Sequence, residues 1–389
     1  MKKTGGWPLP REKVNKKVQD IKPSGIRKFF DLVIGRKDII SLGVGEPDFA
    51  VPWRIREEMI YSLEKGITSY TSNYGLTELR QAIAEYYQKF GLNPPINDVM
   101  ITTGVSEGFD IALRAIVDPG DAVLIPEPCY VSYKPLTILA GGEAITIPTN
   151  PDFKLTYEKI SQHKEAEPKA IVLNYPGNPT GVSYTKKELE EISDAVIEND
   201  MLVISDEIYG ELTYSHKHVS IASLNGMEDR TIVLNGFSKA FAMTGLRLGF
   251  AIAPPDLLDA MLKIHQYSML CAPISAQLGA LEALKNTEEE LEEMRSKYIR
   301  RRNYFVKRLE GVLDVNLPEG AFYAFPSIES TGLGSEEFTE RLLMEKNVAV
   351  VPGNAFGECG EGHIRCAYAV NMEKLKEAAD RIEDFVRNL

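Results

Sequence analysis

Two cations stand eight residues apart in an otherwise small and apolar stretch of this chain. Lys239 and Arg247 lie in the run Asn235–Phe250, which reads NGFSKAFAMTGLRLGF. A buried cation is costly unless an anion or a reaction requires it. A lysine desolvated beside other cations loses affinity for its proton, which is the state that Schiff-base chemistry needs. Gly245 and Gly249, on either side of Arg247, indicate close backbone packing or the approach of a ligand.

Other polar residues follow short apolar runs that are bounded by Gly, Pro, Asn or Asp. These runs begin at Val99, Ala122, Ala170, Leu202, Thr231 and Phe250. Their continuous apolarity predicts strands buried on both faces, as in a mostly parallel sheet wrapped by helices. Ligands bind beyond the carboxyl ends of such strands. We therefore expect the polar residues that follow them to gather at one edge of the sheet: Ser106, Tyr130, Asn178, Asp206, Tyr209 and Lys239.

The distribution of helices and strands predicts an α/β fold with two unequal domains. Helical spacing is plain in four segments, Gly75–Phe90, Thr185–Asn199, Thr287–Leu309 and Met372–Leu389. We expect a large domain over residues 46–284 and a smaller α+β domain over 285–389, where charged helices surround a few short strands. Residues 1–45 carry too little apolar material for a domain, and we expect them to pack as an arm on the small domain.

The composition narrows the class of protein. A net charge of −12 over 389 residues argues against nucleic acid or an anionic membrane as a general partner. Four scattered cysteines without a CxxC pair indicate reduced thiols, and no apolar run approaches the ~18 residues of a membrane span. His216 and His218 lack nearby ligand-type residues, so we expect no metal site. These features favour a cytoplasmic protein.

Each motif taken alone has more than one interpretation. GVSEG, residues 104–108, matches the nucleophile elbow of a serine hydrolase, with Ser106 as the nucleophile. It is also typical of a glycine-rich turn, or of an anion-binding helix N-terminus. Asp206 is typical of a helix cap, Tyr209 of a half-buried aromatic residue, and Asn178 of an Asn-Pro turn.

Together the motifs resemble the class I/II aminotransferases, which are pyridoxal-phosphate enzymes of fold type I. The resemblance runs from SLGVGEPDF (Ser41–Phe49) to GHIRCAYA (Gly362–Ala369). Between these ends, the Tyr70–Gly75 turn, NPTG, DEIY and SKAFAMTGLRLG follow in the family's order. That order and spacing make the resemblance highly specific, and the chain looks most similar to archaeal aminotransferases of aromatic amino acids or aspartate.

The resemblance implies how the ring of the cofactor is held. Lys239 would bind pyridoxal phosphate covalently and, once the substrate displaces it, would move the Cα proton as a general acid/base. Asp206 would pair with the pyridine nitrogen and keep it protonated. Tyr209 and Asn178 would hydrogen-bond the phenolic oxygen, and Tyr130 would stack on the face of the ring.

The resemblance also implies a phosphate pocket built from several parts of the chain. Arg247, whose planar fork suits phosphate, would bind it together with Ser238. Val105 and Ser106 would complete the cradle at a helix N-terminus. Tyr70 would reach in from a neighbouring subunit.

At the substrate end, the resemblance implies that Arg365 binds the α-carboxylate, with the backbone at Gly45 completing the pocket. A site shared between domains and subunits implies a homodimer and closure of the small domain. We therefore expect transfer of an amino group from an L-amino acid, aromatic by preference and otherwise aspartate or alanine, to a 2-oxo acid such as 2-oxoglutarate. The alternatives are a pyridoxal-phosphate C–S or β-elimination lyase and, more distantly, a serine hydrolase using Ser106.

Four positions depart from the family pattern. Gly236 stands where a serine is frequent, and Leu246 and Tyr130 replace frequent tryptophans. Ser106 stands where related bacterial aspartate enzymes carry a lysine that helps to bind a distal carboxylate. The resemblance therefore does not imply strict specificity for aspartate.

Overall fold

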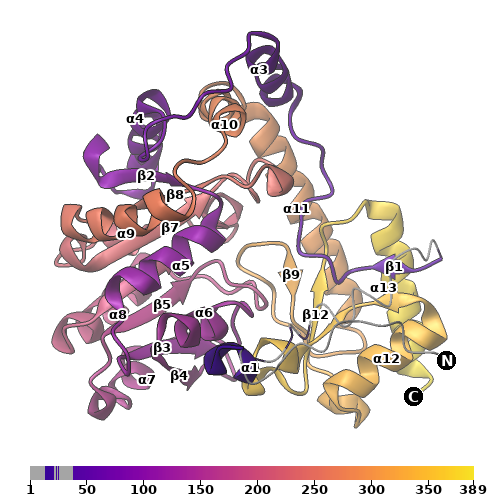
Figure 1. The fold of residues 1–389 in the computed structure, drawn as a ribbon. Coiled ribbons are helices and arrows are strands. Elements are labelled where there is room, and N and C mark those ends of the chain that lie inside the picture. Colours follow the sequence, from indigo (N-terminus) through magenta and orange to yellow (C-terminus); the bar gives the residue numbers. More distant parts are fainter. Residues whose placement is uncertain (1–13, 22, 24, 26–37) are drawn as a thin grey trace, which may run out of the picture.

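A seven-stranded sheet forms the centre of the larger part of the molecule (Figure 1). The computed structural model describes residues 14–21, 23, 25 and 38–389. The strand order is β2-β8-β7-β6-β5-β3-β4, and only β8 runs antiparallel to its neighbours β2 and β7. The strands are β2 (Val99–Thr102), β3 (Ala122–Glu127), β4 (Glu143–Pro148), β5 (Ala170–Asn174), β6 (Leu202–Asp206), β7 (Thr231–Gly236) and β8 (Gly249–Ile252).

Helices cover both faces of this sheet. Neighbouring strand residues alternate between the two layers, so that Ile204 packs with one cluster of apolar side chains and Val203 with another. Helices α5 (Val105–Ile116), α6 (Tyr133–Ala140) and α9 (Pro255–Ser268) contribute to the first cluster. The second face is covered by α7 (Tyr157–Ser161) and α8 (Lys186–Glu198), and by α3 (Trp53–Glu64), α4 (Thr77–Tyr87) and α10 (Ile274–Asn286).

The predicted α/β class is confirmed. All six predicted strands are present, and the four predicted helices begin and end within a few residues of their expected bounds. Strand β4 was not predicted, because it is an edge strand whose residues are mostly half-buried or exposed and it lacks a continuous apolar run.

The C-terminal part has an apolar cluster of its own, built from three helices and a small antiparallel sheet. The helices are α11 (Glu288–Leu309), α12 (Ser335–Lys346) and α13 (Met372–Arg387). The small sheet has the order β11-β12-β9, with β9 (Tyr323–Ala324), β11 (Val351–Pro352) and β12 (Ile364–Ala367). Strand β1 (Ile40–Ser41) pairs with β10 (Val348–Ala349), and Ile40 and Leu42 lie in the same cluster as α12 and α13.

The proposed N-terminal arm is described only in part. Residues 40–42 lie against the C-terminal part, whereas α1 (Lys16–Asp20) contacts α6 of the larger part. The rest of that segment lies outside the described residues, and the domain bounds stay a prediction. No helix in the described ranges combines the length and apolarity needed to cross a membrane.

Candidate active site

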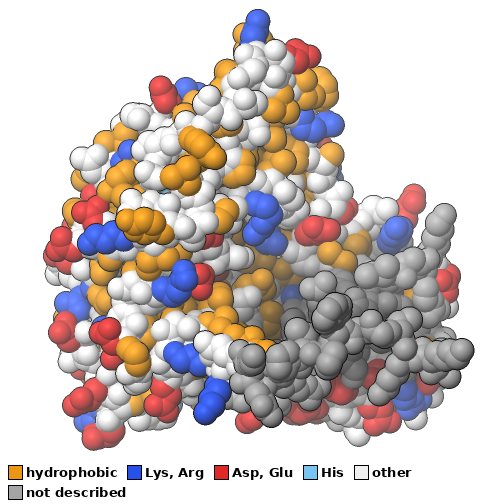
Figure 2. All heavy atoms as spheres, in the orientation of Figure 1, with side chains coloured by type: hydrophobic (Ala, Val, Ile, Leu, Met, Phe, Trp, Pro, Cys, Tyr) orange, Lys and Arg blue, Asp and Glu red, His pale blue; other side chains and the backbone are white. Residues whose placement is uncertain are grey.

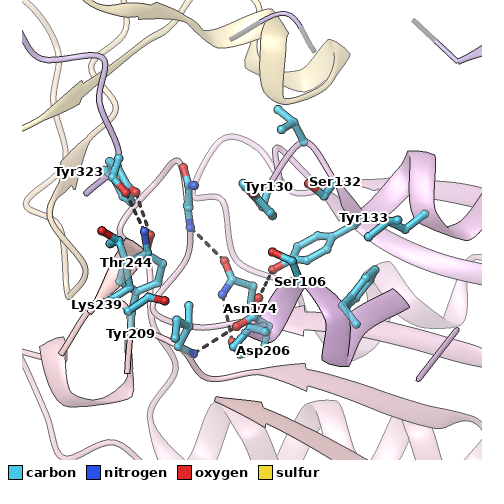
Figure 3. A pocket seen from close by; sticks show the side chains of 18 of the residues that line it. Ser106, Tyr130, Ser132, Tyr133, Asn174, Asp206, Tyr209, Lys239, Thr244 and Tyr323 are labelled. Carbon is cyan, nitrogen blue, oxygen red and sulfur yellow. Dashed lines mark hydrogen bonds between the residues drawn. The ribbon is translucent and has the colours of Figure 1, made fainter. Parts of the chain in front are cut away.

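A cavity of about 630 Å³ lies at the carboxyl ends of the parallel strands. Figure 3 shows Lys239, Tyr209 and Tyr323 on one side of it, with Tyr130 and Tyr133 across from them. The structure brings together eleven of the twelve predicted site residues in its walls: Gly45, Val105, Ser106, Tyr130, Asn178, Asp206, Tyr209, Ser238, Lys239, Arg247 and Arg365. Tyr70 does not line the cavity, and its side chain is 82% exposed.

Lys239 follows β7, and its amine points into the cavity. Its Nζ donates a hydrogen bond of 2.7 Å to the carbonyl oxygen of Gly45. Burial, followed by the positive charge of Arg365, lowers the pKa of Lys239 to about 8. Near neutral pH, Lys239 is therefore a neutral, nucleophilic amine in a larger fraction of molecules than an exposed lysine would be.

Close backbone packing explains the small residues around this lysine. A Cβ atom at Gly249 would lie 2.8 Å from the backbone nitrogen of Val105, and one at Gly236 would lie 2.8 Å from the carbonyl oxygen of Leu248. These contacts pack β7 and β8 directly against the start of α5. A side chain at position 236 would not fit this arrangement without a shift of the backbone.

Asp206 ends β6 at the floor of the cavity. Its carboxylate accepts hydrogen bonds from the hydroxyl of Tyr133 (2.7 Å) and from the backbone nitrogen of Ile208 (3.2 Å). Burial raises the pKa of Asp206 to about 6, and these two hydrogen bonds act in the opposite direction. The carboxylate is therefore held ionised at neutral pH in a buried place where it attracts a cationic ring nitrogen.

An anion cradle lies at the N-terminus of α5. Arg247 has a left-handed backbone (φ 53°), and its Nη1 donates to the carbonyl oxygen of Thr244 at 2.9 Å. A Cβ atom at Gly104 would lie only 2.9 Å from Arg247 Nη2, so the guanidinium approaches the turn that opens the helix. The backbone of Val105 and Ser106 forms the first helical turn beside it. A guanidinium and the positive end of a helix together favour binding of a phosphate.

A carboxylate in the same first turn is paired with a buried histidine. Glu107 accepts from the backbone nitrogen of Thr103, and its Oε1 lies 2.7 Å from Nδ1 of His265 on α9. The His265 side chain is fully buried. This pair fixes the start of α5 against α9.

Arg365, on β12, also lines the cavity. Its Nη1 donates to Asn178 Oδ1 at 2.9 Å and its Nη2 to the carbonyl oxygen of Gly43 at 2.5 Å. The guanidinium lies 4.6 Å from the ring centre of Tyr323 and 4.8 Å from that of Phe356. Its Nε is buried and has no hydrogen-bond partner among the described residues. An unpaired buried donor on an arginine is what a substrate carboxylate would satisfy.

Several residues of the site were missed by the sequence reasoning. Tyr323 shares a hydrogen bond of 2.8 Å with Tyr209, and Asn174 donates from its side chain to the carbonyl oxygen of Asp206. Tyr133 was missed although it stands three residues after Tyr130 in CYVSY, on the helical turn that follows β3. Asn178, expected near the phenolic oxygen of the cofactor, makes its side-chain contact to Arg365.

The chemistry of these residues fits one class of enzyme. Pyridoxal phosphate carries an aldehyde, a pyridine nitrogen and a phosphate, and the cavity offers an amine of lowered pKa, a buried carboxylate and an anion cradle for them. The sheet and the cavity thus define a pyridoxal-phosphate enzyme.

Comparison with known proteins gives the family. The family model for aminotransferases of class I and II matches residues 37–382. An aspartate aminotransferase of Pyrococcus abyssi is 47% identical over 94% of this chain and 96% of its own length. Aromatic-amino-acid aminotransferase 2 of Thermococcus litoralis is 44% identical over 95% of this chain and 97% of its own. The solved aromatic aminotransferase of Pyrococcus horikoshii has a TM-score of 0.88 and 44% identity, covering 93% of this chain and 99% of that one.

The chain belongs to the aminotransferases of class I and II. It is a pyridoxal-phosphate enzyme of fold type I that transfers an amino group between amino acids and oxo acids, as the sequence predicted. The comparisons do not favour the lyase or the serine hydrolase. In keeping with this, Ser106 lies at the anion cradle, and no histidine is among the described residues that line the cavity.

Proposed function

We propose that the residues of this cavity have the roles that the family resemblance implies. Arg247, Ser238 and the first turn of α5 bind the phosphate, while Asp206 pairs with the pyridine nitrogen and Tyr130 packs on the ring. When bound, pyridoxal phosphate withdraws electrons from the substrate and stabilises negative charge at Cα. The observation that carries the proposal is the lowered pKa of Lys239 in a cavity that also holds Asp206.

The other residues position the substrate and move its proton. Arg365 binds the α-carboxylate with its unpaired Nε as one of the donors, which places the amino acid between Tyr323 and Lys239. The freed amine of Lys239 then takes the proton from Cα, because a pKa of about 8 suits proton transfer near neutral pH. The hydroxyl of Tyr209, held by Tyr323, and the side chain of Asn178 orient the reacting groups.

The preferred donor is an aromatic L-amino acid, with aspartate or alanine next and 2-oxoglutarate as an acceptor. Aromatic and apolar side chains form much of the wall, including Phe109, Tyr130, Leu136 and Tyr323. The cations among the described lining residues are Lys239, Arg247 and Arg365, and each has a role already. A distal carboxylate therefore finds hydroxyl groups, such as that of Ser106, where an aspartate-specific site would offer a cation.

The relatives support both donor classes, so the test is a substrate panel. We expect kcat/KM for phenylalanine or tyrosine, with 2-oxoglutarate as acceptor, to exceed that for aspartate by about tenfold or more. If aspartate is the better donor by that factor, the assignment of the wall as an aromatic pocket is wrong. Replacing Ser106 with lysine should shift the ratio towards aspartate.

The enzyme acts as a homodimer with shared sites. Large apolar side chains are exposed over α3 and the segment after it, and Figure 2 shows hydrophobic side chains at the top of the molecule, where Figure 1 places α3. The set comprises Trp53, Ile60, Tyr61, Leu63, Ile67 and Tyr70. An apolar patch of this kind supports a subunit interface, in which Tyr70 enters the partner's phosphate pocket. Light scattering of the purified protein measures the mass directly.

The proposal extends to the domains of the chain and to its place in the cell. The chain divides into the arm (1–45), the large domain (46–284) and the small domain (285–389), which closes over the substrate. The boundary near residue 285 falls where α10 ends and α11 begins. We place the enzyme in the cytoplasm, in keeping with its four free cysteines.

A further inference from the structure

Residues 43–48, which read GVGEPD, contact both cations at the substrate end of the cavity. The carbonyl oxygen of Gly43 accepts from Arg365 Nη2 at 2.5 Å, and that of Gly45 accepts from Lys239 Nζ at 2.7 Å. Residues 43–48 therefore hydrogen-bond both Arg365, which is proposed to bind the carboxylate, and the free amine of Lys239. Whatever fixes this segment also fixes the directions in which the two cations point.

Regular secondary structure does not fix the segment. Just before it, the backbone of Leu42 is held by hydrogen bonds with Ala349 (2.8 Å) and Ala367 (2.7 Å). Residues 43–51 make no backbone-to-backbone hydrogen bond with another described residue, and α3 begins only at Trp53. The position of the segment thus depends on side-chain contacts, namely a 3.3 Å hydrogen bond from Thr244 Oγ1 to Glu46 Oε2 and the contacts at its far end.

An ion pair with α11 provides that far anchor. Arg301 donates two hydrogen bonds to Asp48, from Nη1 to Oδ1 at 2.7 Å and from Nη2 to Oδ2 at 2.9 Å. The Arg301 side chain is 8% exposed, so this fork-to-fork contact is shielded far better than a surface pair. Beside it, the ring of Phe49 packs edge-on against Tyr298 of α11 at 5.3 Å.

We propose that Asp48 and Arg301 are a positioning pair for the transfer reaction. They hold residues 43–48 so that the carbonyl groups of Gly43 and Gly45 orient Arg365 and Lys239. Asp48 lies three residues after Gly45, so a displacement at the ion pair is passed on through a very short length of chain. Neither member of the pair lines the cavity. The inference rests on the roles proposed above for Lys239 and Arg365.

A second ion pair on the same helix provides a matched control. Arg308, seven residues further along α11, pairs with Asp380 and Glu383 of α13. It carries the same charge on the same helix, but its contacts hold α13 and not residues 43–48. We therefore expect loss of this pair to destabilise the packing of α11 without altering the contacts of Arg365 and Lys239 with residues 43–48.

The test compares five full-length holoenzymes: Asp48→Asn, Arg301→Gln, Arg301→Lys, the double variant Asp48→Asn/Arg301→Gln, and the control Arg308→Gln. We expect Asp48→Asn and Arg301→Gln each to lower kcat/KM for the amino donor about tenfold, chiefly through KM, because Arg365 loses its orientation. The double variant should be no worse than either single variant, because both remove one interaction. Arg301→Lys keeps the charge but loses the two-pronged hydrogen bonding, so its kcat/KM should lie between those of the wild type and Arg301→Gln.

Two further readouts separate positioning from simple stabilisation. The dissociation constant for pyridoxal phosphate should stay within about twofold in every variant, because neither Asp48 nor Arg301 contacts the phosphate cradle and residues 43–48 meet its loop through one hydrogen bond, from Thr244 Oγ1 to Glu46 Oε2 at 3.3 Å. In cofactor-free protein, the pH at which the Lys239 amine reacts with an acylating reagent should fall in Asp48→Asn, since Gly45 no longer stabilises the ammonium form. It should not change in Arg308→Gln.

The positioning role is overturned if Asp48→Asn and both Arg301 variants change only the melting temperature, as Arg308→Gln does. A separate variant, Lys239→Ala, tests the premise. If Lys239→Ala keeps full activity, the proposed function fails and the inference with it. If Lys239→Ala is inactive while the Asp48 and Arg301 variants match the control, only the inference fails.

Discussion

The hydroxyl of Tyr133 donates a 2.7 Å hydrogen bond to the buried carboxylate of Asp206. The ring of the same tyrosine packs edge-on against Tyr130 at 5.6 Å and lies 4.6 Å from Phe109. Tyr133 therefore connects the residue proposed to meet the pyridine nitrogen with the one proposed to stack on the ring. Tyr133, which the sequence did not predict as a site residue, thus contacts both Asp206 and Tyr130.

Replacing Tyr133 with phenylalanine removes only this hydrogen bond. The pKa of Asp206, already raised to about 6 by burial, should rise further because the bond favours the ionised form. More of the carboxyl group is then protonated near neutral pH and is unable to pair with a cationic nitrogen. We expect the affinity for pyridoxal phosphate, measured by absorbance titration, to fall about tenfold at pH 6 and less at pH 9. Equal affinities for both proteins at pH 6 would refute this role.

Asp206→Asn should stabilise the cofactor-free protein at neutral pH while removing the carboxylate proposed to pair with the pyridine nitrogen. The folded-state pKa of Asp206, about 6, lies above the ordinary value of an aspartate. Protonation of Asp206 therefore adds to the free energy of unfolding at low pH, and this contribution is lost as the pH rises through 6. In cofactor-free protein at pH 7.5, the variant should be about 1–3 kcal/mol more stable than the wild type, and the difference should shrink towards pH 4. Urea unfolding measures this. A variant that is less stable at pH 7.5 would show that the carboxylate is not strained there.

The reactivity of Lys239 should report its lowered pKa. In cofactor-free protein we expect acylation of this amine, followed by mass spectrometry, to reach half of its maximal rate near pH 8. Burial and then Arg365 are the main causes, so Arg365→Gln should move the midpoint to higher pH. The other lysines of the same sample serve as internal controls. A midpoint for Lys239 at the same pH as theirs would contradict the electrostatic account.

Mixed dimers test whether Tyr70 acts across the interface. Lys239→Ala should be inactive alone, and Tyr70→Phe should lose about tenfold in affinity for the cofactor through the missing phosphate contact. A dimer of one subunit of each kind contains one intact site if Tyr70 serves its partner. At a cofactor concentration near the wild-type dissociation constant, where Tyr70→Phe is mostly unloaded, refolding the two variants together should then give more activity than either parent. No gain on mixing would place Tyr70 in its own subunit's site or outside any site.

The sequence predicts the parts of the site that stand at strand ends. Lys239 and Asp206 each follow a continuous apolar run, and the parallel arrangement of those strands brings them to one edge. Arg365 was found only through the family resemblance, because it lies within a short strand of another sheet. Its contact with Asn178 spans 187 positions of the chain, and no local pattern encodes such a contact.

The contacts between side chains could not be predicted in the same way. Tyr133 and Tyr323 are two aromatic residues among many, and only the packing of α6 and β9 turns their hydroxyl groups towards the cavity. Gly236, a departure from the family pattern, is explained by the carbonyl oxygen of Leu248, which leaves no space for a Cβ. This restriction comes from tertiary structure and is invisible in the residue itself.

The central claim is that Lys239 binds the cofactor and carries the proton, and an absorbance spectrum tests it most directly. Purified wild-type protein loaded with pyridoxal phosphate should show a band at ~420 nm that moves to ~330 nm when an amino acid donor is added. Addition of 2-oxoglutarate should restore the first band. In Lys239→Ala we expect neither this cycle nor turnover. The same cycle of bands in Lys239→Ala would contradict the account.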